Sequence, residues 1–121
     1  MTEPTQEERV KALQTRSSYV ENVLKHALVA GLAFIAWKRS PTLSLQVFNS
    51  EVDDSGFDVV LGFDTHVRYV QLKQSHSGKK LSKCSVRTSF ASRNGSCVVL
   101  MIHSLETLKL ESFRFFWQCA S

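Results

Sequence analysis

The hydrophobic residues in the first third of this chain follow a helical spacing. Between Tyr19 and Ile35, apolar side chains recur at steps of three and four residues, which predicts an amphipathic helix with one buried face. Ser18 and Glu21 match the S-x-x-E capping box, and this match predicts that the helix begins there. Pro41 ends it, because the residue before a proline disfavours the helical conformation.

Beyond this point the hydrophobic spacing changes to the period of two that marks a half-buried β-strand. Residues 43–47 alternate in this way, and residues 57–63 and 67–73 predict two further strands. The polar connection between the last two is too short for a helical crossover, so we expect an antiparallel hairpin. Residues 96–103 are almost continuously apolar, which predicts a central strand buried on both faces.

Two segments have a less regular pattern. Residues 83–91 favour a strand that runs into a helical turn, while residues 105–117 fit a strand and a helix equally well. The order of elements predicts an α/β sandwich built on a mixed sheet. The length of the chain leaves room for one domain, which we place at residues 17–121. Residues 1–16 are expected to form a flexible arm or a short leading helix.

Composition and cysteine usage narrow the class of protein. The chain has three cysteines without a paired metal-type spacing, a pattern that indicates reduced thiols in the cytoplasm. The N-terminus lacks the apolar core of a secretory signal. The longest apolar run, residues 27–37, is shorter than the roughly 20 residues that span a bilayer. We therefore expect a cytoplasmic protein that does not bind a membrane.

Charge is distributed unevenly along the chain, although the net charge is only +4. Five of the eleven acidic residues lie between Glu51 and Asp64, whereas no acidic residue lies between Thr65 and Leu105. An acidic cluster beside a basic tract can hold a cation next to a polyanion, but a solvated basic face gives the same pattern. The basic side chains of the tract are Arg68, Lys73, Lys79, Lys80, Lys83, Arg87 and Arg93.

Three side chains of the predicted hairpin are suited to metal-assisted chemistry. Asp58 stands near the start of one strand, and Gln71 and Lys73 stand near the end of the next. Gln71 and Lys73 are two residues apart and therefore point to the same face. Oxygen atoms of Asp58, Gln71 and the Leu72 carbonyl suit a hard cation such as Mg²⁺ or Mn²⁺. The Lys73 ammonium group suits the negative charge of a phosphodiester under attack.

The segment around Asp58, followed by Gln71, Leu72 and Lys73, resembles the D…(E/Q)-x-K signature of the PD-(D/E)xK nuclease superfamily. Its glutamine is similar to that of methylation-directed restriction endonucleases. Glu21 stands where the superfamily carries a helix glutamate, and the resemblance covers roughly residues 18–103.

This resemblance implies a restriction endonuclease-like α/β sandwich with a central mixed β-sheet flanked by helices. It also implies an Mg²⁺- or Mn²⁺-dependent endonuclease that hydrolyses DNA in bacterial defence or DNA repair, with Glu21 orienting a metal-bound water. Two residues depart from the pattern: Phe57 replaces the usual proline, and Gln71 replaces an acid and so removes one negative charge. We expect the basic tract to hold DNA phosphates at the rim of the site, through Lys79, Lys80, Lys83, Arg87 and Arg93.

Simpler interpretations stand beside these roles. Glu21 can be a capping residue, Asp58 a turn residue, and Lys73 a solvated lysine on an exposed strand. The alternative function is a non-catalytic nucleic-acid or protein interaction module that keeps a degenerate nuclease fold. The apolar strip from Phe113 to Trp117 is either the last core element or an interface, which would join two copies or a larger parent protein.

Overall fold

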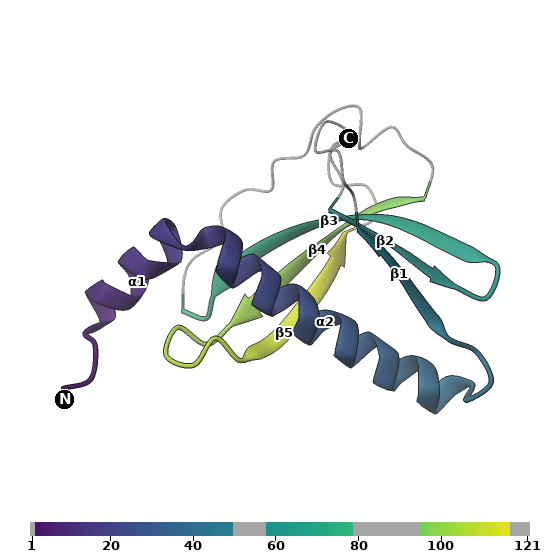
Figure 1. The fold of residues 1–121 in the computed structure, drawn as a ribbon, viewed down its shortest axis with the longest axis horizontal. Helices are drawn as coiled ribbons and strands as arrows, with labels where there is room; N and C mark the ends of the chain where they lie inside the picture. The colour runs from purple at the N-terminus through teal and green to yellow at the C-terminus, as the bar shows by residue number, and fades with distance from the viewer. Residues whose placement is uncertain (1, 50–57, 79–94, 117–121) are drawn as a thin grey trace.

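Helices and a mixed β-sheet make up the described parts of the chain. The computed structural model describes residues 2–49, 58–78 and 95–116 (Figure 1). The sheet has five strands in the order β1-β2-β3-β4-β5, and β3 and β4 are parallel while the other neighbours are antiparallel. The elements are α1 (Gln6–Thr15), α2 (Ser17–Arg39), β1 (Leu45–Asn49), β2 (Val59–Phe63), β3 (His66–His76), β4 (Ser96–His103) and β5 (Leu110–Phe116). The α/β class and the mixed sheet are therefore confirmed.

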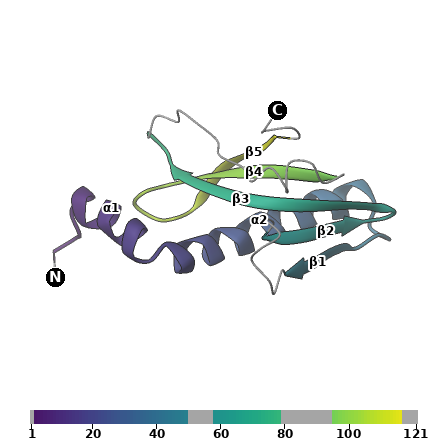
Figure 2. The ribbon, with the colours of Figure 1, turned by 90° about the horizontal axis from the view of Figure 1, so that it is seen from above.

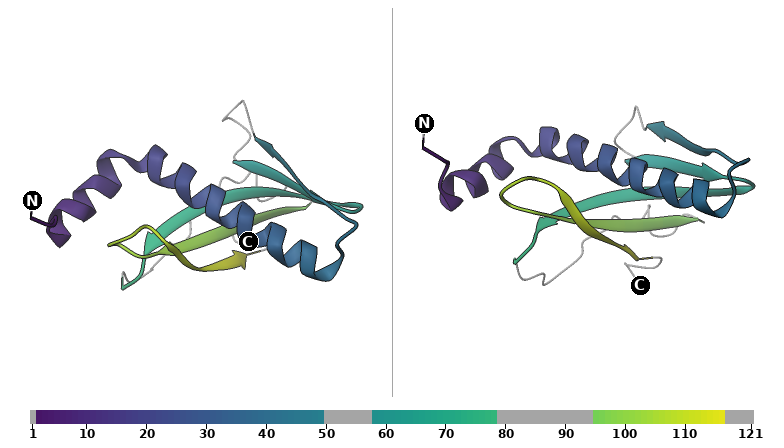
Figure 3. Two further views of the ribbon diagram at one scale, coloured as in Figure 1. Left: turned by 60° about the horizontal axis from the view of Figure 1, so that its bottom comes forward. Right: turned by 90° about the horizontal axis from the view of Figure 1, so that it is seen from below.

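Helix α2 packs across one face of the sheet (Figure 3). Its inward residues Val20, Leu24 and Leu28 follow four-residue steps and are buried, as the helical period predicts. They join a single core with the strand residues that point toward α2. Those residues are Val59, Val70, Leu72, Cys97, Val99 and Met101.

The start of α2 differs from the prediction. Its N-cap is Arg16, which makes no side-chain capping bond, and the helix already includes Ser17 and Ser18. Ser18 lies inside the helix and so cannot adopt the non-helical N-cap conformation. The expected capping box of Ser18 and Glu21 is therefore wrong.

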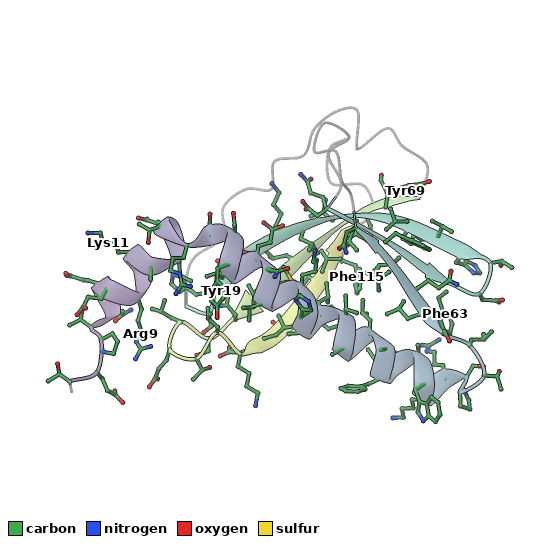
Figure 4. All side chains as sticks on the ribbon, in the orientation of Figure 1. Arg9, Lys11, Tyr19, Phe63, Tyr69 and Phe115 are labelled. Atoms are coloured by element: carbon green, nitrogen blue, oxygen red, sulfur yellow. The ribbon has the colours of Figure 1, made fainter. Side chains whose placement is uncertain are left out.

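A capping box does occur one helix earlier, within the segment expected to be an arm. The side chain of Thr5 accepts the N–H of Glu8, and the Glu8 carboxylate accepts the N–H of Thr5. The leading helix α1 has no buried residue. One link to the sheet comes from Arg9, which donates to the Glu106 carbonyl at 2.7 Å in the β4–β5 connection (Figure 4).

The predicted hairpin is confirmed as β2 and β3. Phe63 pairs with His66, so Asp64 and Thr65 alone form the connection. Asp64 has a φ of 58°, a left-handed conformation that aspartate tolerates better than most residues. Beyond Val70 the strand β3 continues to His76 without a β2 residue beside it.

The two apolar segments near the C-terminus have different environments. β4 is buried on both faces as predicted, since Val98 and Val99 point to opposite faces and are 1% and 0% exposed. β5 forms an edge of the sheet (Figure 2). Of the undecided segment, residues 110–116 therefore form a strand. Phe113 packs against the core, and its ring meets that of Phe115 edge to face at 5.5 Å. Of the apolar strip, Trp117 lies outside the described residues.

Cys97 is a buried free thiol on β4. Burial raises the pKa of this thiol from its ordinary value of 9.0 to about 11, and the charge of Arg68 lowers it by a smaller amount. The raised pKa favours the protonated native state, so its contribution to stability is complete below pH 9.0 and is lost as the pH rises through about 11.

We therefore expect Cys97 to react with iodoacetamide at pH 8.5 about a hundredfold more slowly in the native protein than in the unfolded chain, because the thiolate is the nucleophile. Mass spectrometry of the peptide that contains Cys97 measures both rates. The unfolded chain in urea is the control, and equal rates in the two states would contradict the prediction.

Candidate metal site at the edge of β3

The Asp58 carboxylate lies against the backbone of β3 where strand β2 begins. The backbone N–H of Asp58 donates to the Val70 carbonyl at 2.8 Å. Its side-chain Oδ2 accepts the N–H of Leu72 at 2.7 Å, in a partly buried position. The carboxylate thus occupies the place beside β3 that the next residue of a longer β2 would take, and it satisfies a donor of the strand edge.

The Leu72 carbonyl points to the same edge. In a β-strand, the N–H and C=O of one residue are directed toward the same neighbouring strand. Since the Leu72 N–H is bound by Asp58, the Leu72 carbonyl also faces the side from which Asp58 approaches. The Leu72 side chain itself is buried in the core under α2. Two oxygen-bearing groups, the Asp58 carboxylate and the Leu72 carbonyl, therefore face the same edge of β3.

Gln71 and Lys73 belong to the other face of β3. Strand alternation places Val70 and Leu72 toward α2, so Gln71 and Lys73 point away from the helix. The side-chain oxygen Oε1 of Gln71 is buried and has no hydrogen-bond partner among the described residues. A buried acceptor left without a partner costs about 1–3 kcal/mol, so this oxygen is suited to accept a ligand.

Ser75 extends the same row of side chains, although the D…(E/Q)-x-K pattern does not include it. Its hydroxyl oxygen is buried and also has no hydrogen-bond partner in the described parts of the chain. Ser75 is two residues beyond Lys73, so the alternation that joins Gln71 and Lys73 extends to it. Lys73, which is half-buried, therefore lies between two residues whose buried side-chain oxygens have no hydrogen-bond partner within residues 2–49, 58–78 and 95–116.

Glu21 approaches from a different layer. It lies on α2, which covers the face of the sheet opposite to Gln71 and Lys73. Lys25, one helical turn later on the same side of α2, donates to the Asn49 side chain at 2.9 Å, and Asn49 pairs with Val59 at the start of β2. Glu21 is thus near the end of the sheet where Asp58 lies. The sheet separates it from Gln71 and Lys73, so these side chains can share a ligand only at the β3 edge.

The described residues fit a hard divalent cation in kind but supply little charge. Asp58, the Gln71 side chain and the Leu72 carbonyl offer oxygen atoms, which Mg²⁺ and Mn²⁺ prefer. Within residues 2–49, 58–78 and 95–116, no group of three His, Cys, Asp or Glu side chains comes together to hold a metal. With one carboxylate at the edge, the expected affinity is below that of a site with two acids.

The structure does not test the expected DNA-binding residues. Lys79, Lys80, Lys83, Arg87 and Arg93 all fall outside the described residues. No protein-family model, curated protein or solved structure gives a significant match to this chain. Support for a function therefore comes from the residues at the β3 edge.

Proposed function

We propose that this chain is a metal-dependent nuclease-like domain that hydrolyses phosphodiester bonds of DNA, with an arrangement of the restriction endonuclease-like type. The observation that carries the proposal is the buried side-chain oxygen Oε1 of Gln71, which has no hydrogen-bond partner among the described residues; Gln71 directly precedes Leu72, whose N–H donates to Asp58. Support for the finer fold comes from the order of α2, the β1-β2-β3 meander and the parallel strand β4.

In this proposal each residue of the β3 edge has a separate task. Asp58, the Gln71 side-chain oxygen and the Leu72 carbonyl would hold Mg²⁺. When bound, the ion would supply a polarised water and positive charge at the scissile phosphate. The Lys73 ammonium group donates a hydrogen bond to a phosphate oxygen as negative charge develops there. The Ser75 hydroxyl donates to a second phosphate oxygen and so positions the substrate.

The charge distribution supports a polyanionic substrate. The acid-free tract between Thr65 and Leu105 follows Asp58 in the sequence and includes Lys73 itself. Basic side chains that contact phosphates fix the position of DNA without reading its sequence. A DNA substrate therefore agrees with the chemistry proposed at Lys73.

Manganese binding tests the proposed ligand set directly. In titration calorimetry, replacing Gln71 with glutamate is expected to tighten Mn²⁺ binding about tenfold, because it restores the second negative charge of the site. Asp58→Asn is expected to remove detectable binding, because the remaining donors are uncharged.

Gln74→Glu is the matched control. It adds the same charge to the same strand, but on the face toward α2, and it should leave the affinity unchanged. Mn²⁺ binding that is absent from both the wild-type and Gln71→Glu proteins would reject the metal site and favour a non-catalytic interaction module. An equal gain from Gln71→Glu and Gln74→Glu would show a general charge effect in place of a ligand.

A further inference from the structure

The C-terminal half of α2 exposes large apolar side chains. Phe34 is 74% exposed, Trp37 68% and Ile35 48%. Along the outward side of the helix, the polar Asn22 and His26 come first and Phe34 and Trp37 follow at helical spacing. Phe34 and Trp37 are three residues apart and so lie next to each other on the helix surface, and exposed apolar surface of this kind is typical of binding sites. We call Phe34, Ile35 and Trp37 the aromatic end of α2.

The charged residues that follow the aromatic end in the sequence are both positive. Lys38 and Arg39 follow Trp37 in the last turn of α2, and both are exposed. No acidic residue occurs between Asn22 and Asn49. In a two-fold symmetric dimer with its axis at this surface, Lys38 and Arg39 of the two copies would lie close together and repel one another. An anionic partner is complementary, whereas a second copy is not.

The apolar side chains identify the kind of anionic partner. Tryptophan and phenylalanine on one side of a helix, with lysine or arginine beside them, are typical of helices that lie at a lipid–water interface. By length and composition, α2 is long and apolar enough to cross a membrane, the single such helix in the part of the chain that the structure describes. However, Val20, Leu24 and Leu28 pack it against the sheet. The helix would therefore lie along the membrane surface and would not cross the bilayer.

We propose that the aromatic end of α2 binds the surface of an anionic lipid membrane. Phe34 and Trp37 enter the headgroup region, and Lys38 and Arg39 contact the lipid phosphates and carboxylates. This inference goes beyond the proposed nuclease function and does not depend on it. It differs from the expectation that the protein has no membrane partner, because a peripheral helix needs no apolar run that spans the bilayer.

Vesicle flotation tests the proposal. The full chain is expected to float with phosphatidylcholine vesicles that contain phosphatidylserine, and to remain unbound with phosphatidylcholine alone. The double variant Phe34→Ser/Trp37→Ser should lose at least about tenfold in vesicle affinity, because two aromatic side chains no longer enter the lipid. Lys38→Glu/Arg39→Glu should abolish the dependence on phosphatidylserine.

Phe48→Ser is the matched control, since Phe48 is also an exposed phenylalanine, 57% exposed, on the face of the sheet away from α2. It should bind vesicles like the wild type. In a Trp117→Phe background, which leaves Trp37 as the one tryptophan of the chain, the emission should shift to the blue on adding phosphatidylserine vesicles.

Three outcomes would overturn the proposal. The first is wild-type flotation that is absent or equal with and without phosphatidylserine. The second is full retention of flotation by Phe34→Ser/Trp37→Ser. The third is a wild-type dimer in sedimentation velocity that this variant converts to a monomer, which would assign the aromatic end to self-association.

Discussion

Asp58→Asn is expected to abolish Mg²⁺-dependent cleavage of DNA while the fold stays intact. The asparagine oxygen can accept the Leu72 N–H in place of the carboxylate oxygen that lies 2.7 Å from it, but it carries no charge to hold the ion. Because the metal contributes several kcal/mol of transition-state stabilisation, cleavage should fall by about 10³-fold or more. Nicking of supercoiled plasmid in Mg²⁺ measures the loss.

Two companion variants separate charge from structure. Asp58→Ala also leaves the Leu72 N–H without its acceptor, so we expect it to lower the free energy of unfolding by about 1–3 kcal/mol.

Lys73→Met should keep Mn²⁺ binding and lose about 10²–10³-fold in cleavage, because the phosphate charge is then uncompensated. Wild-type cleavage rates in a folded Asp58→Asn protein would exclude Asp58 from the chemistry.

Leu24→Ala is expected to lower the free energy of unfolding by about 2–5 kcal/mol, as other large-to-small changes in packed cores do. The side chain of Leu24 on α2 has 0% exposed surface and packs against the sheet. Its removal leaves a cavity at the place where the helix is fixed to the strands. Urea denaturation followed by circular dichroism measures the change.

Phe34→Ala on the same helix is the control for Leu24→Ala. Phe34 is 74% exposed, so we expect a change within about 0.5 kcal/mol. The comparison also establishes that the aromatic end of α2 contributes little to folding. Equal destabilisation by the two variants would show that α2 is not fixed to the sheet by its inward residues.

Local patterns predicted the parts of the fold that local interactions determine. The short connection at Asp64 and Thr65 permits a hairpin and little else, and the hairpin is present. The continuous apolar run that became β4 marked a strand buried on both faces, and both faces are buried. Alternation also predicted that Gln71 and Lys73 share a face, which the burial of Val70 and Leu72 under α2 confirms.

Features that depend on distant neighbours were not predictable in the same way. Residues 105–117 fit a strand and a helix equally well because β5 is an edge strand, and its exposed positions follow no strict alternation. The capping-box pattern S/T-x-x-E occurs at Ser18 as well as at Thr5, and the sequence does not show which one begins a helix. The bond from Leu72 to Asp58 and the buried oxygen of Gln71 arise from the three-dimensional packing of β3.

The parallel pairing of β3 and β4 has a consequence for the order of folding. Paired residues of these strands are 27 positions apart, as Tyr69 and Ser96 are, whereas those of the β2–β3 hairpin are between 3 and 11 apart. Because closing a longer loop costs more entropy, sequence-distant pairings form more slowly. Asp58, Gln71 and Lys73 all belong to the short-range hairpin or its border. We therefore expect the strand pair that carries the candidate site to form early in folding and the pairing with β4 to follow more slowly.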